Sequence, residues 1–207
     1  AIIKVLGMRM VRSVILSVVL GRSLDVSRCA AFSVADYWTD SLTTGRYCQH
    51  LAVKSDIRKR INVDQAYLCS LLSSFGQLVL IHHYPKEMSQ ILTDQTGDLS
   101  ELLKTQESQL GVHQGHAVSL MARRWLLPED TALCLQHCFQ TNYEGTSLEL
   151  INFVSGVAQL VSSVAHNRDN IEIPEAILAL DGFDFGESDL IMVAEMRDEV
   201  SSIAKHL

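Results

Sequence analysis

The chain is poor in proline and in aromatic residues: it has three Pro, and Phe, Trp and Tyr make up 6% of its 207 residues. Apolar residues instead recur at spacings of three and four, which is typical of amphipathic and buried helices. The one strand candidate, residues 77–81, contains β-branched residues but continues a helical run without a turn signal. We therefore expect no sheet and an all-α fold class.

Positive charge is also scarce. The sequence has 17 Lys and Arg against 24 Asp and Glu, a formal net charge of −7. This balance argues against the broad cationic surface that non-specific nucleic-acid binding requires, so we expect no nucleic-acid partner. One basic cluster, formed by Lys54, Arg58, Lys59 and Arg60, could contact an anion. We favour the alternative, a solvated helix end whose cations stabilise the preceding helix C-terminus.

Repeated cysteine pair spacings, the mark of disulfide frameworks and zinc knuckles, are missing. The five cysteines lie mostly inside apolar, helix-like runs, which predicts reduced thiols in a cytosolic protein. They are Cys29, Cys48, Cys69, Cys134 and Cys138.

The apolar run that opens the chain is too short to cross a membrane. Residues 1–21 are strongly apolar, but Lys4, Arg9 and Arg12 interrupt them, and a membrane-spanning helix needs roughly 20 apolar residues. We expect a core helix here and no membrane insertion. Because the chain begins at Ala1 inside this helical pattern, without Met or an N-cap, we also expect it to be a fragment.

The helical pattern and its punctuation predict one compact domain over residues 1–207, with the helices of residues 147–207 packed on the same core. Pro128 is expected in the first turn of its helix, where a missing N–H costs little. The predicted helices cover residues 1–20, 32–54, 64–82, 86–92, 100–110, 114–126, 129–140, 147–165, 174–180 and 188–206.

The familiar short motifs of nucleotide-binding loops and serine hydrolases are absent, which leaves His and Cys clusters as candidate sites. Cys134, His137 and Cys138 could present two thiolates and an imidazole to zinc from one helix face. We favour the alternative of a buried face of small side chains, because Cys is often buried and three ligands from one helical turn suit a tetrahedral site poorly.

The remaining histidines form two pairs. His113 and His116 are three residues apart and could share a helix face. We expect them to flank a helix start, near solvent. His82 and His83 are adjacent, so on a helix they point about 100° apart, too divergent to reach one ion easily.

Four stretches in register resemble HDOD domains, bacterial signalling modules related to HD-type metal-dependent phosphohydrolases. "AIIKVLGMRMVRSVIL" resembles the family's opening run, and "DYWTDSLTTGRYCQHLA" resembles its W-x-x-S-L segment. "AYLCSLLSSFGQLVL" resembles its G-L-L-H-D-I-G helix. "ESQLGVHQGHAVSLMARRWLLP" resembles its E-x-x-x-G-x-x-H-x-x-x-G-x-x-L-x-x-x-W-x-L-P segment, with Val118 in place of a small Gly. The positions that carry this structural signature are Trp38, Gly76, Gly111, Trp125 and Pro128.

The resemblance extends from Ala1 to about Phe139. It implies an HD-like helical bundle whose N-terminal helical part is missing from this chain. It also implies where catalytic relatives hold their metal. Ser73 and Ser74 replace a His and an Asp, and Asp40 and Gln114 each replace a single His ligand. His137 and Cys138 occupy a paired-His position, and Ser155 with Gly156 occupies the final Asp position. Hydroxyls and amides are poor substitutes for imidazole and carboxylate ligands of a divalent ion.

We therefore predict a non-catalytic, cytoplasmic signalling domain that needs no cofactor. It would act by binding an unknown signalling protein or a small ligand in the degenerate cleft; homo-oligomerisation is left open. The alternative is a divergent metal-dependent phosphohydrolase acting on cyclic nucleotides or phosphomonoesters. It would use Asp40, His137, Cys138 and one of His82, His83, His113 or His116.

Overall fold

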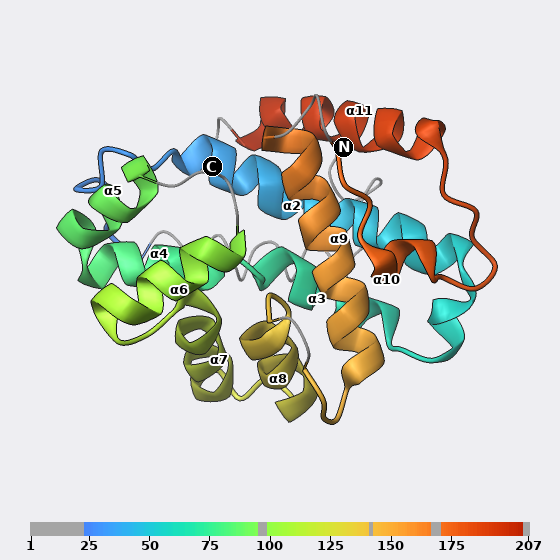
Figure 1. Cartoon of the computed structure of the whole chain (residues 1–207), viewed down its shortest axis with the longest axis horizontal. Helices are drawn as coiled ribbons and strands as arrows, with labels where there is room; N and C mark the ends of the chain where they lie inside the picture. Colours follow the sequence, from blue (N-terminus) through green and yellow to red (C-terminus); the bar gives the residue numbers. More distant parts are fainter. Residues whose placement is uncertain (1–22, 95–98, 141–142, 167–170, 205–207) are drawn as a thin grey trace.

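The computed structural model describes residues 23–94, 99–140, 143–166 and 171–204 (Figure 1). Helices form all of the regular secondary structure in this part of the chain, as the sequence predicts. The predicted helix over residues 1–20 lies outside the described residues. The elements are α2 (Val34–Lys54), the 3₁₀ helix η1 (Asp56–Lys59), α3 (Val63–Leu72), α4 (Phe75–His83), α5 (Pro85–Asp94), α6 (Leu99–Leu110), α7 (Gln114–Arg124), α8 (Glu129–His137), α9 (Leu148–His166), α10 (Glu175–Leu178) and α11 (Glu187–Ala204).

Helix starts follow capping rules that are visible in the sequence. The Ser33 hydroxyl accepts a hydrogen bond from the Asp36 N–H at the start of α2, and the Asn62 side chain accepts one from the Gln65 N–H at the start of α3. Pro128 is the N-cap of α8, one residue before the first turn that we expected. Most predicted helices therefore begin and end within a few residues of the observed ones.

The prediction of one continuous helix over residues 64–82 is wrong. The chain leaves α3 at Ser73 and starts α4 at Phe75, with Ser74 at φ −92° and ψ 1°. The Ser73 hydroxyl donates to the Ser70 carbonyl oxygen at 3.0 Å, a local bond that competes with the regular helix ladder. The two serines thus mark a break between two helices, and this break redirects α4 towards α7.

Gly76 explains why α4 comes so close to α7. A Cβ built on this glycine would overlap the Gln114 carbonyl oxygen and lie 2.6 Å from the Gln114 carbonyl carbon. Only a residue without a side chain permits this approach of two backbones. The contact joins the central motif of the sequence to the start of α7, where another predicted site residue lies.

The main hydrophobic core combines side chains from α2, α3, α4, α7, α8, α9, α10 and α11. In Figure 1, α9 crosses in front of α2 and α3, while α11 runs along one edge of the molecule. Trp38 is buried within this core at 4% exposure. Trp125 is only half-buried and packs edge-on against Phe75, with ring centroids 5.4 Å apart.

All five cysteines are buried free thiols, in agreement with the prediction of reduced cysteines. The one described helix that is long and apolar enough to cross a membrane is α9, and its apolar side chains, among them Phe153, Val157 and Leu160, lie in the core. This burial is what a core helix of a folded domain requires.

Candidate functional site

A cavity of about 390 Å³ lies where α2, α4, α6, α7 and α9 meet. Its wall is mixed: carboxylates, hydroxyls, amides and an imidazole face aliphatic and aromatic side chains. A pocket of this size with convergent polar groups is the usual setting for recognition of a small molecule or a peptide side chain. The lining residues are Ala31, Phe32, Ser33, Asp36, Tyr37, Asp40, Ser74, Gln77, Leu92, Leu99, Leu102, Gln114, Ser162 and His166.

Three of the predicted positions meet on this wall although they are far apart in the sequence. Asp40 comes from the middle of α2, Ser74 from the junction of α3 and α4, and Gln114 from the first turn of α7. The resemblance implied that all three stand where catalytic relatives place metal ligands. The cavity, which we call the cleft, is therefore where these three positions implied by the resemblance come together.

Asp40 is the acid of these three positions, and a cation within the protein already engages it. Its Oδ1 accepts a hydrogen bond from Arg197 Nε at 3.1 Å and forms an ion pair with Arg197 Nη2 at 3.0 Å. Burial raises the pKa of Asp40 above its ordinary value, and the guanidinium opposes part of that rise. Such a two-point contact to Arg fixes the carboxylate and neutralises its charge.

Gln114 is held by a second amide. Its backbone N–H donates to Gln106 Oε1 at 2.9 Å, and Gln106 Nε2 donates to Gln114 Oε1 at 3.3 Å. Both glutamines are buried, at 0% and 2% exposure. This pair satisfies polar groups that would otherwise be costly to bury, and it supplies no negative charge to the cleft.

The structure places the other predicted positions away from the cleft lining. Ser73 is buried against its own helix, and Gly156 of α9 packs against Ala176 and Ile177 of α10. Ser155 accepts a hydrogen bond from Gln159 on the same helix. Their assignment as former ligand positions stays a prediction that rests on the resemblance.

On α9 the cleft is lined instead by Ser162 and His166, with Ser162 about two helical turns after Ser155. Neither residue is among the predicted site positions, and the same holds for Gln77 and Tyr37. No short sequence motif marks these residues, and only the folded structure shows that their helix faces converge.

Cys134, His137 and Cys138 do not form a common ligand face. Both thiols are fully buried, whereas the His137 ring is half-exposed, stacks on Tyr143 at 4.4 Å and contacts Gln140 Oε1 at 2.6 Å. Burial raises the pKa of Cys138 and Cys134, which disfavours the thiolate form that a metal needs. This arrangement agrees with the favoured alternative of a buried face of small side chains.

The predicted face shared by His113 and His116 exists, since their rings stack with centroids 4.2 Å apart. His113 is the N-cap of α7, so the two residues do flank a helix start. The expectation that both lie near solvent is wrong for His113, which is 7% exposed because its ring folds back over Gly115. His82 instead accepts a hydrogen bond from the Asp25 N–H at Nδ1.

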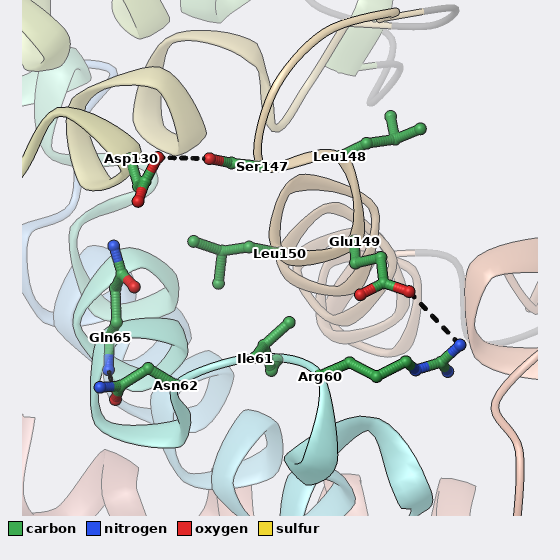
Figure 2. Close-up of a pocket in the computed structure, with 9 residues that line it drawn as sticks. All are labelled: Arg60, Ile61, Asn62, Gln65, Asp130, Ser147, Leu148, Glu149 and Leu150. Atoms are coloured by element: carbon green, nitrogen blue, oxygen red, sulfur yellow. Dashed lines mark hydrogen bonds and ion pairs between the residues drawn. The ribbon is translucent and has the colours of Figure 1, made fainter.

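Figure 2 shows a second cavity, of about 350 Å³, at the N-terminal end of α9. Arg60 of the basic cluster lies on its wall and pairs with Glu149 at 3.4 Å and with Asp181 at 3.3 Å. Asp130 accepts a hydrogen bond from Ser147 Oγ at 2.6 Å. Of the charged side chains drawn there, Arg60 pairs with Glu149, and Asp130 is hydrogen-bonded to Ser147.

Residues of the basic cluster therefore form ion pairs and hydrogen bonds with neighbouring parts of the chain. Lys59 pairs with Asp56, and Arg58 donates to the Val53 carbonyl oxygen near the end of α2. This agrees with the favoured interpretation of a solvated helix end whose cations interact with the preceding helix.

Comparison with protein families gives a match to the HDOD domain over residues 1–139. This is the range over which the four sequence motifs lie in register. The search of curated proteins finds no match to the chain.

Solved structures share the fold at low sequence identity. A protein from Marinobacter aquaeolei VT8, provisionally named for signal transduction, is 17% identical with a TM-score of 0.72, and the match covers 97% of this chain and 45% of that one. A provisionally named phosphohydrolase from Shewanella amazonensis SB2B is 17% identical with a TM-score of 0.71, covering 98% and 74%. The MmoQ response regulator from Methylococcus capsulatus str. Bath is 18% identical with a TM-score of 0.62, covering 80% and 63%. The chain thus spans less than half of the Marinobacter protein, and at these identities the likeness shows the fold alone.

Proposed function

Because the chain belongs to the HDOD domain family, we propose that it is a non-catalytic regulatory domain of signal transduction, which acts by binding in its cleft. Family membership and the names of two structural neighbours, a signal-transduction protein and a response regulator, support the regulatory role. The bound group is a side chain of a partner protein or a small ligand. The proposal includes a cytoplasmic location, as reduced cysteines favour.

One observation carries the non-catalytic part of the proposal: the carboxylate at a former ligand position, Asp40, is committed to Arg197. A metal hydrolase needs several imidazole or carboxylate ligands to hold an ion and to lower the pKa of a bound water. At the other two positions on the cleft wall, Ser74 and Gln114 offer a hydroxyl and an amide that is already paired. This wall suits hydrogen bonding better than metal-assisted hydrolysis.

The first test is an assay of phosphomonoester and cyclic-nucleotide hydrolysis with added Mg²⁺, Mn²⁺ or Zn²⁺. We expect no hydrolysis above a protein-free blank. Hydrolysis by the wild type that is lost in Asp40→Asn would overturn the proposal in favour of the phosphohydrolase alternative.

The second test asks whether the cleft binds. Gln77→Trp places an indole on the cleft wall, whereas Gln90→Trp adds the same group to the exposed face of α5. Proteins and small molecules retained by the immobilised wild-type chain from a host lysate are identified by mass spectrometry. We expect specific retention to be lost in Gln77→Trp and kept in Gln90→Trp; equal retention by both variants would remove the cleft from the proposal.

A further inference from the structure

Three side chains of the types that ligate metal ions in proteins lie together at the corner between α6 and α7. Gly111, at φ +72°, turns the chain so that the last turn of α6 faces the first turn of α7. Glu107 comes from α6, His113 is the N-cap of α7, and His116 follows one turn later. None of the three lines the cleft.

The geometry of these side chains approaches a coordination site. One donor atom from each residue lies within 4.8 Å of the other two, and His116 Nδ1 is 3.9 Å from Glu107 Oε2. Donor atoms of a tetrahedral site with bonds of about 2.0–2.1 Å lie about 3.3 Å apart. Closing the set therefore requires side-chain rotations that turn the lone pairs of His113 and His116, whose rings now stack face to face, towards one ion. Within the described ranges, this is the one group of three or more such residues that meets that spacing.

We propose that Glu107, His113 and His116 bind a divalent transition-metal ion of the zinc class. Two imidazoles and one carboxylate form a donor set that suits Zn²⁺ and its neighbours rather than Mg²⁺ or Ca²⁺, which prefer oxygen ligands. With three protein ligands, the fourth position is open to water or to a donor from a partner.

Exposure and charge favour access of an ion to this corner. The side chains of His116 and Glu107 are 40% and 49% exposed, while the His113 ring forms a buried wall behind them. Burial and the neighbouring His116 lower the pKa of His113, and the Glu107 carboxylate opposes them.

Metal binding competes with the helix cap. His113 Nδ1 accepts a hydrogen bond from the Gly115 N–H at 3.1 Å. Coordination through Nδ1 takes this lone pair, and coordination through Nε2 requires a proton on Nδ1, so either mode gives up the cap bond. The ion therefore substitutes for the cap, and the Gly115 amide should report its arrival.

The test uses metal-stripped protein, isothermal titration with Zn²⁺ and visible spectra with Co²⁺. We expect one ion per chain, with affinity at least about tenfold weaker in His116→Gln and in Glu107→Gln. His83→Gln removes an exposed histidine on α4 and should leave affinity unchanged. Circular dichroism checks that the variants fold, and the Gly115 amide resonance should shift only in those that bind. No saturable binding, or equal binding by His116→Gln and the wild type, would overturn the site.

A failure of this inference differs from a failure of the proposed function. If the ion binds in the cleft, uptake survives His116→Gln and is lost in Asp40→Asn, which contradicts both proposals. If it binds at the α6–α7 corner, uptake survives Asp40→Asn, and the cleft stays free for recognition.

Discussion

Gly76 has the tightest backbone environment among the glycines of the structure, since its Cα hydrogens face the Gln114 carbonyl group. We expect Gly76→Ala to lower the free energy of unfolding by about 3 kcal/mol or more, because rigid backbone must shift to admit the methyl group. The measurement is urea denaturation followed by circular dichroism.

Gly111→Ala is the matched control for that change. It has a positive φ but nothing within 4 Å of the added Cβ, so only backbone strain of about 1 kcal/mol is expected. Equal losses in the two glycine variants would show that the contact between α4 and α7 can relax.

His50 provides a pH dependence at the residue scale. Its Nε2 is buried without a hydrogen-bond partner among the described residues, and its ring stacks on Tyr47. Burial lowers the pKa of His50, Lys54 acts in the same direction, and Asp189 opposes them.

Because the unfolded chain then binds the proton more readily, the contribution of His50 to stability is complete above a pH of about 6.5 and is lost as pH falls towards its lower folded pKa. We expect the melting temperature to drop between pH 7 and 5, and to drop less in His50→Gln than in the wild type. His83→Gln is the control. An unchanged pH profile in His50→Gln would show that other groups cause the loss.

At the scale of the helices, the two tryptophans anchor different contacts. Trp38 of α2 lies in the hydrophobic core, whereas Trp125, at the C-terminal end of α7, covers Phe75 and is half-buried. We expect Trp38→Ala to cost about 3–5 kcal/mol and Trp125→Ala clearly less. Chemical denaturation followed by circular dichroism compares them without relying on tryptophan fluorescence. A larger loss for Trp125→Ala would contradict the observed burial.

Helix positions were largely predictable because capping residues and periodicity act locally. Ser33, Asn62 and Pro128 each mark a helix start within one or two residues of where the structure has it. The break at Ser73 and Ser74 was not predictable from the apolar pattern, because α3 and α4 are both buried and their periodicity runs on through the junction. The break accompanies the approach of α4 to the α7 backbone, which is a tertiary contact.

At the scale of the whole molecule, the cleft was also only partly predictable from the sequence, because it is formed by tertiary contacts. The resemblance identified the family and implied a common role for Asp40, Ser74 and Gln114, which the structure brings together on one wall. The Asp40–Arg197 pair joins residues 157 positions apart, on helices that no motif connects. Ser162 and His166, which line the cleft from α9, were not predicted, because a helix of continuous apolar character gives no register from sequence alone.

The charge balance of the cleft decides whether the lost chemistry could be restored. We expect the double variant Ser73→His, Ser74→Asp to remain without tightly bound metal. Ser73 is 3% exposed and lies off the cleft lining, so an imidazole there would be forced into the packed junction. A carboxylate at residue 74 would share the wall with Asp36 and Asp40, and like charges without a cation between them repel.

The other ligands that a metal ion needs would still be missing, because Gln114 stays hydrogen-bonded to Gln106 and Asp40 stays paired with Arg197. The double variant should therefore melt at a lower temperature than the wild type and contain no stoichiometric Zn, Mn or Fe by mass spectrometry. The single variant Ser74→Asp separates the two effects: it adds the charge but spares the junction, so it should lose less stability. Tight metal uptake with a raised melting temperature in the double variant would mean that the cleft is two residues from a metal site, and the non-catalytic proposal would fall with that result.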